Sequence, residues 1–283
     1  MSYDFSSQAK LFSIALDILE DYNISDWSFG GGTALSSIYY KHRMSYDIDI
    51  FLEDFSSMQV IIEYQEEIAR NLGIGKQHIK SSPTGVTFTL DANSHGLKLD
   101  FVYSPSLTSN PYNHKTVFGF KNIKTQTPLE IIAKKLKFRE KATIRDFVDY
   151  AVSQEQDEIM SKLKYEGIVD IERYFEVIEK FDKFDANVFN AELKLLFPNK
   201  KLCKDDFANT IRSIMKSGSK IKIALDLNEE IVAFDEFIPV YQKHYAPLGK
   251  LQVLEIENNG LNYQELMSMG KEEIKNLINK GNK

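Results

Sequence analysis

The chain has 283 residues, of which 43% are hydrophobic and 27% charged, and its formal net charge is −6 at pH 7. This composition is typical of a globular protein, and the acidic total argues against a surface that is basic all over, although it leaves room for a local basic patch. No apolar run approaches the roughly 18 residues of a membrane span, no signal peptide is recognisable, and the single cysteine fits a reducing compartment. We therefore expect a cytoplasmic protein with no membrane contact.

Hydrophobic spacing predicts an amphipathic helix over 6–21 and another over 58–72. Between them, a short apolar strand over 27–29 leads through three glycines into a helix over about 33–41, and a second strand covers about 47–52. We predict that this central stretch organises the site, because it joins a glycine turn to a strand that carries two aspartates.

Asp47 and Asp49 are expected on one side of the second strand, since strand side chains alternate between faces and Ile48 and Ile50 point into a core. Two carboxylates this close repel each other unless a cation lies between them, and a divalent metal is the usual cation. The glycines lead into a helix N-terminus, which offers backbone N–H groups to a phosphate. The stretch therefore predicts a site for phosphate and metal.

Three short strands are predicted over 78–81, 86–90 and 97–103. In the third strand, apolar residues alternate with Lys98 and Asp100, so these two residues share the polar face. Asp100 is therefore expected to present a third carboxylate beside the first two.

A helix start is predicted at Thr127, with Pro128 at the first helical position and Glu130 at the third. The solvated face of this helix is expected to carry four charged residues: Glu130, Lys134, Lys137 and Lys141. Lys135 lies at the boundary of the apolar face, from which its ammonium can reach into a cleft. From Lys134 to Arg145 the chain has six basic residues and one acid, which favours a patch that faces an anion.

Beyond about residue 152 the pattern becomes long, charged and helical, with recurring Phe and Tyr. We therefore predict two domains, residues 1–152 and residues 153–283, of which the second is mainly helical. Its aromatic residues are interpreted as core residues rather than as platforms for stacked bases.

Four motifs carry a family resemblance over about residues 27–150. The segment GGGTALSSIYYKHRMSYDIDIF, which begins at Gly30, resembles the first motif of the DNA-polymerase-β-like nucleotidyltransferases, and its GGTAL, His-Arg-x-Ser and Asp-Ile-Asp parts are similar to the AbiEii/AbiGii toxin branch. KLDF, from Lys98, resembles the later strand that supplies a third carboxylate. LEIIAKKL, from Leu129, and RDFVD, from Arg145, are similar to the last motifs of the branch.

The resemblance implies an α+β fold: a polymerase-β-like nucleotidyltransferase domain with a mixed sheet flanked by helices, then a mainly helical C-terminal domain. It also implies a toxin of a bacterial toxin–antitoxin or phage-defence system that moves NMP from an NTP, with a two-metal Mg²⁺ site. The implied partners are an RNA acceptor, in some members the 3′ end of tRNA, and a cognate antitoxin. Two alternatives stay open: transfer to a protein hydroxyl or small molecule, and a non-catalytic nucleotide-binding protein.

Each implied role is carried over residue by residue. The resemblance assigns nucleotide binding to Gly31, Gly32 and Thr33, metal binding to Asp47, Asp49 and Asp100, triphosphate contact to Lys135, and completion of the catalytic set to Asp146. Arg43, just before the predicted strand over 47–52, is a further candidate for binding phosphate or RNA.

At one position the chain departs from the family pattern: the superfamily often has serine after the glycine, and here Thr33 supplies the same hydroxyl.

Other candidate residues also have a simpler interpretation. Asp146 has a second interpretation as the third residue of a capping box opened by Thr143. Arg145 and Asp149 are also spaced as a surface ion pair.

Overall fold

The computed structural model describes residues 3–90, 96–197, 200–216, 220–226, 231–233 and 251–257. The chain forms two compact units, one made of Met1–Lys135 and Ala191–Leu202, the other of Leu136–Asn190 and Cys203–Lys283. This division falls earlier than the domain boundary predicted at residue 152, and a later segment of the chain returns to the first unit.

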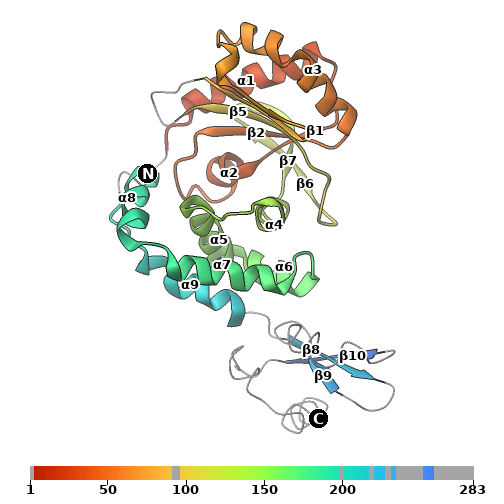
Figure 1. Ribbon diagram of the computed structural model, residues 1–283, viewed down its shortest axis with the longest axis vertical. Coiled ribbons are helices and arrows are strands. Elements are labelled where there is room, and N and C mark those ends of the chain that lie inside the picture. The colour runs from red at the N-terminus through yellow and green to blue at the C-terminus, as the bar shows by residue number, and fades with distance from the viewer. Residues whose placement is uncertain are drawn as a thin grey trace. The chain divides into compact units, whose positions relative to one another are not determined.

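A seven-stranded mixed sheet lies at the centre of the first unit, in the order β3-β4-β5-β2-β1-β7-β6 (Figure 1). Its strands are β1 (Trp27–Gly30), β2 (Asp47–Leu52), β3 (Ile79–Ser82), β4 (Gly85–Thr89), β5 (Lys98–Tyr103), β6 (Tyr112–Val117) and β7 (Phe120–Gln126). β2 runs parallel to β5 and β1 runs parallel to β7, whereas the other neighbours are antiparallel. The predicted α+β fold with a mixed sheet is confirmed.

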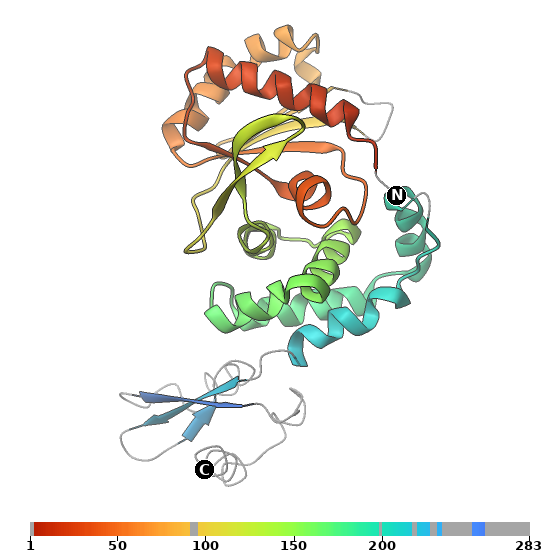
Figure 2. The ribbon, with the colours of Figure 1, turned by 180° about the vertical axis from the view of Figure 1, so that it is seen from behind.

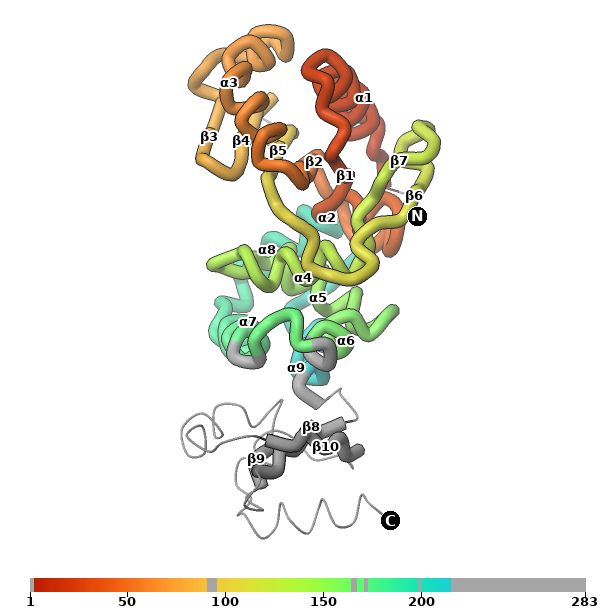
Figure 3. Tube along the Cα trace, turned by 90° about the vertical axis from the view of Figure 1, so that its right-hand side faces the viewer, coloured from red at the N-terminus to blue at the C-terminus, as the bar shows by residue number. Residues whose placement is uncertain are grey.

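Helices α1 (Ser6–Asp21) and α3 (Phe55–Asn71) cover one face of this sheet, and α2 (Gly31–Ala34) lies on the other face (Figures 1 and 2). α3 runs over β3, β4 and β5 (Figure 3). The core lies between these helices and the sheet, where the rings of Phe12 and Phe29 meet edge to face with centroids 5.0 Å apart. Ile48 and Ile50 are fully buried, as the predicted alternation requires.

Helix α4 (Pro128–Phe138) begins in the first unit, and its last residues belong to the second. The second unit continues with α5 (Ile144–Asp157), α6 (Ile159–Glu166), α7 (Ile171–Lys183) and α9 (Asp205–Lys216); α8 (Ala186–Leu196) starts in it and ends in the first unit. A three-stranded sheet of order β10-β8-β9 follows, built from β8 (Lys220–Asp226), β9 (Ile231–Ala233) and β10 (Leu251–Glu257). The helical pattern gave no sign of this sheet.

Aromatic side chains fill the core of the second unit. Phe181 packs against Phe147 and Phe189, with ring centroids 5.4 and 5.6 Å apart, and all three side chains are buried. Tyr174 is also fully buried. For Tyr174, Phe181 and Phe189 the interpretation as core is confirmed.

Within the described ranges, no helix has both the length and the apolar character to cross a membrane.

Candidate active site

Asp49 and Asp100 lie opposite each other on neighbouring strands. The parallel register of β2 and β5 pairs Asp49 with Asp100, and Asp47 with Lys98. Paired positions share a face of the sheet, and all three aspartates are half-buried, with Asp49 and Asp100 each between two buried apolar residues and Asp47 before buried Ile48. The structure therefore places Asp47, Asp49 and Asp100 on one face, opposite the core that α1 and α3 cover.

Thr87 holds the third carboxylate, and the sequence did not point to it. The antiparallel register of β4 and β5 sets Thr87 opposite Asp100, and its Oγ1 donates a hydrogen bond to Asp100 Oδ1. Alternation within the strand over 86–90 puts Thr87 on a polar face, but only the pairing of strands shows which carboxylate it reaches.

The glycine turn packs directly against the aspartate face. Gly30 pairs with Asp49 across β1 and β2, and Gly31 starts α2 with φ +69°, a conformation that strains residues with a side chain. A Cβ atom on Gly31 would collide with Asp49 Oδ2 and lie 2.8 Å from Asp49 Cβ. Glycine at position 31 therefore makes room for the carboxylate of Asp49 over the turn.

Thr33 joins the turn to β2. Its buried side chain donates a hydrogen bond from Oγ1 to the backbone oxygen of Asp47. Because this bond uses the only hydroxyl proton, contact between the Thr33 hydroxyl and a phosphate stays a prediction. The helix starts at Gly31 rather than Thr33, and a π-helical turn, Leu35–Tyr39, continues it.

Arg43 lies against the same turn. Its side chain is only 1% exposed, and its Nη1 donates to the backbone oxygen of Met44 at 2.8 Å. A Cβ atom on Gly32 would lie 2.6 Å from Arg43 Nη2, so the guanidinium packs onto the glycine backbone. The loop that carries Arg43 is held by α1, because Gln8 Nε2 donates to the backbone oxygen of Ser45 at 2.8 Å.

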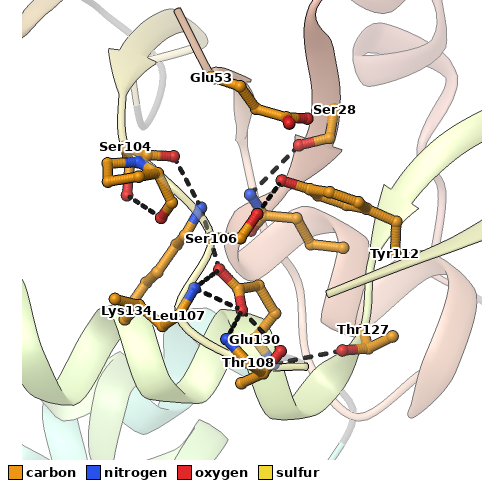
Figure 4. Close-up of polar contacts among 12 residues, drawn as sticks. Ser28, Glu53, Ser104, Ser106, Leu107, Thr108, Tyr112, Thr127, Glu130 and Lys134 are labelled. Atoms are coloured by element: carbon orange, nitrogen blue, oxygen red, sulfur yellow. Dashed lines mark hydrogen bonds and ion pairs between the residues drawn. The ribbon is translucent and has the colours of Figure 1, made fainter. Parts of the chain in front are cut away.

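Two predictions about α4 are wrong. Glu130 and Lys134 are 0% and 5% exposed, although a solvated face was expected for both; Lys137 and Lys141 are exposed as predicted. Thr127 does cap the helix, since Glu130 N donates to its Oγ1 at 3.3 Å. The Glu130 carboxylate, however, turns to the segment that follows β5 (Figure 4), which covers this face of the helix. Lys135, beside it, is also nearly buried.

Asp146 belongs to the second unit, where it completes a capping box at the start of α5. Thr143 Oγ1 accepts from Asp146 N, and Asp146 Oδ2 accepts from Thr143 N at 2.9 Å. Arg139 Nη1 lies 3.0 Å from the same carboxylate oxygen. The capping interpretation of Asp146 is therefore confirmed, and its catalytic role stays a prediction. Asp149 is fully buried, so a surface pair with Arg145 is excluded.

We expect Asp146→Asn to lower the free energy of unfolding by about 1–3 kcal/mol, because a buried acceptor of several hydrogen bonds loses its charge. Thr143→Val removes the hydroxyl that accepts from Asp146 N, and it should lower the free energy of unfolding by about 1 kcal/mol. Urea denaturation measures both losses. If Asp146 is also catalytic, only Asp146→Asn loses nucleotidyl transfer at a temperature where both variants are folded; equal activity would assign Asp146 to the cap alone.

The carboxylate oxygens of Asp47, Asp49 and Asp100, which share one face of the sheet, fit a hard divalent cation, because such a cation prefers carboxylate ligands. Because Gly31 has no Cβ atom, the carboxylate of Asp49 can lie directly against the glycine turn. In the part of the chain that the structure describes, no three His, Cys, Asp or Glu side chains are grouped as metal ligands. The predicted ligand set therefore stays a prediction.

Most of the sequence matches a family model. The model, described as nucleotidyl transferase AbiEii toxin, type IV toxin–antitoxin system, covers residues 18–235, which is more than half of the chain. The chain belongs to this AbiEii family. It is therefore a nucleotidyltransferase of a toxin family, as the motifs implied.

Several solved structures resemble this AbiEii-family chain. JHP933 from Helicobacter pylori is 17% identical, with a TM-score of 0.42 over 75% of this chain and 91% of its own. The nucleotidyltransferase toxin MenT4 (Rv2826c) from Mycobacterium tuberculosis H37Rv is 15% identical, with a TM-score of 0.45 over 78% and 86%. ANT(2")-Ia, in complex with adenylyl-2"-tobramycin, is 13% identical, with a TM-score of 0.38 over 54% and 93%. No curated relative matches the sequence.

Proposed function

We propose that this AbiEii-family enzyme transfers NMP from an NTP to RNA, with the 3′ end of tRNA as the favoured acceptor, and that a cognate antitoxin restrains it as a toxin. The observation that carries the proposal is the pairing of Asp49 with Asp100 on a face shared with Asp47, directly beside the glycine turn. NTP and RNA as substrates place the proposed reaction in the cytoplasm.

Mg²⁺ is the proposed cofactor, held by Asp47, Asp49 and Asp100. When bound, such ions neutralise charge on the phosphates and make a hydroxyl a better nucleophile. The protein's part is to fix its own carboxylates. Thr87 restrains Asp100 through a hydrogen bond, and the backbone of Gly31 leaves room for Asp49.

Phosphoryl transfer depends chiefly on positioning and charge neutralisation, because the protein supplies little covalent chemistry. Gly31 and Gly32 begin α2, whose first backbone N–H groups are the proposed contact for a phosphate. Thr33 secures this turn to β2. Arg43, beside Gly32, is the proposed cation on this side of the triphosphate, and Lys135 is the proposed cation on α4. Arg43 and Lys135 are nearly buried, which strengthens their interaction with an anion.

The proposed RNA acceptor needs cations that reach its backbone. In the second unit, Lys137 and Lys141 are exposed just beyond the buried part of α4 and at its C-terminal side. They support an RNA contact and predict that transfer weakens with added salt.

The test incubates the full-length protein with each α-labelled NTP in turn, Mg²⁺, and three acceptor pools: total RNA, total protein and a panel of small-molecule hydroxyl compounds. Label in RNA, mapped to the 3′ end of tRNA by nuclease digestion, is the expected result. Label in protein or in a small molecule without label in RNA would reject the acceptor while keeping the reaction. NTP binding without any label transfer would reject the reaction itself.

A further inference from the structure

We propose that Glu130 and Lys134 form a positioning pair that holds Lys135 and Asp100 in the geometry needed for nucleotidyl transfer, without touching the NTP themselves. The inference rests on the proposed function, because Lys135 and Asp100 act in that reaction. All four residues lie in the first unit.

Glu130 ties the first turn of α4 to the segment that follows β5. Its carboxylate accepts from the backbone N–H groups of Leu107 at 3.0 Å and Thr108 at 2.9 Å, and from Thr108 Oγ1 at 2.7 Å (Figure 4). A buried carboxylate is unfavourable unless its oxygens are satisfied, so these bonds are hard to exchange. The segment from Ser104 to Thr108 is therefore fixed on α4.

Lys134 connects the next turn of α4 to β2, through Phe51, and to Ser104, directly after the end of β5. Its Nζ lies 3.2 Å from Glu130 Oε1, donates to the backbone oxygen of Ser104 at 3.1 Å, and lies 4.8 Å from the ring centroid of Phe51 (Figure 4 draws the polar contacts). Burial lowers the pKa of Lys134, and the charge of Glu130 opposes this shift. Glu130 therefore favours the charged form of the lysine at this place.

The pair lies between the helix and the two strands that carry the aspartates. Ser104 lies four residues after Asp100, directly beyond the end of β5. Its N–H donates to the backbone oxygen of Leu52, the last residue of β2, at 3.0 Å. Phe51 follows Asp49 by two residues, so both side chains lie on the same face of β2. A shift of the pair would therefore move the far end of the strands that hold the carboxylates.

Lys135 is the residue directly after Lys134, and successive helical residues point in directions about 100° apart. The pair sets the rotation of α4 against Phe51 of β2 and against the segment that follows β5, so it also sets where the ammonium of Lys135 lies relative to Asp49 and Asp100. Lys135 is only 6% exposed, which leaves its side chain few alternative positions. Glu130 and Lys134 are positioning residues in this sense.

The kinetic test compares Glu130→Gln and Lys134→Met with Lys10→Met, a change to an exposed lysine of α1. In the positioning variants we expect kcat to fall on the order of 10²-fold, as for a displacement near 1 Å, with KM for the NTP little changed. Lys134→Arg keeps the charge and should recover most of kcat. The double variant Glu130→Gln/Lys134→Met should be no slower than the worse single variant, since both remove one unit.

A second test does not depend on enzyme activity. Competitive acetylation of all lysines in the full chain is read by mass spectrometry, and hydrogen exchange is measured for residues 104–108. Glu130→Gln should speed acetylation of Lys135 and exchange at Leu107 and Thr108, and should leave Lys137 unchanged. If Glu130→Gln does not fold, Lys134→Met and Lys134→Arg give the same comparison. Unchanged acetylation of Lys135, or kcat equal to that of Lys10→Met, overturns the proposal. If the wild-type protein has no transferase activity but Glu130→Gln still speeds acetylation of Lys135, the result supports the pair and rejects only the proposed function.

Discussion

Asp49→Asn is expected to reduce nucleotidyl transfer about 10³-fold without unfolding the protein. Asp49 is the carboxylate that both pairs with Asp100 and lies over Gly31. Metal ions contribute several kcal/mol to stabilising charge in the transition state. A loss of ~4 kcal/mol corresponds to about three powers of ten in rate. Because asparagine has nearly the same shape and Asp49 is only half-buried, the sheet should keep its register.

The matched control is Asp17→Asn, an exposed aspartate on α1, the helix that covers the opposite face of the sheet. It removes the same charge from the chain and should leave the rate at the wild-type value. The initial rate of label transfer, with circular dichroism to check the fold, measures both variants. Wild-type activity in Asp49→Asn would exclude Asp49 from the metal site, and excess Mn²⁺ that restores the variant would support it.

Gly31→Ala is expected to be nearly as damaging to activity, again about 10³-fold, because its methyl group would displace the same carboxylate. The new Cβ would collide with Asp49 Oδ2, and Asp49 Cβ is 2.8 Å away, so rotation of the aspartate alone does not remove the overlap. The backbone adds a second effect. At φ +69°, alanine is strained by roughly 1–2 kcal/mol relative to glycine, which should lower the stability of the fold as well.

Gly73→Ala separates these two effects. Gly73 has φ +71°, close to that of Gly31, but a Cβ there meets nothing within 4 Å. Both variants should lose the roughly 1–2 kcal/mol of backbone strain in urea denaturation. Gly31→Ala should lose more than this because of the overlap with Asp49, and only Gly31→Ala should lose transfer activity. Equal activity in the two variants would mean that the contact between Gly31 and Asp49 has no part in the reaction.

Strand alternation made the aspartate face predictable from sequence. Asp47, Asp49 and Asp100 each alternate with buried apolar residues, so their side of the strand follows from periodicity. Periodicity does not say which strands are neighbours. The register that sets Asp49 beside Asp100, and Thr87 against Asp100, arises from strand order and was visible only in the folded sheet.

The solvated face predicted for α4 was wrong for a related reason. Helical periodicity assigns charged residues to solvent, but a charged residue is buried where another segment supplies its partners. Glu130 and Lys134 find theirs in the backbone of Ser104, Leu107 and Thr108, more than twenty residues earlier in the chain. Asp146 shows the opposite case. Its capping box with Thr143 is local, and the spacing Thr-x-x-Asp was enough to suggest it.

By itself, the sequence determined the family and the nucleotidyltransferase chemistry, and it predicted the residues of the candidate site, because motifs and alternation depend on neighbours along the chain. The tertiary structure alone decided that Gly31 lies beneath Asp49, that Arg43 packs on Gly32, and that the lysine beside Lys135 is buried and bonded to the backbone of Ser104. These contacts join residues that are distant in sequence. Their geometry depends on sheet order, loop path and burial, which no local pattern of residues encodes.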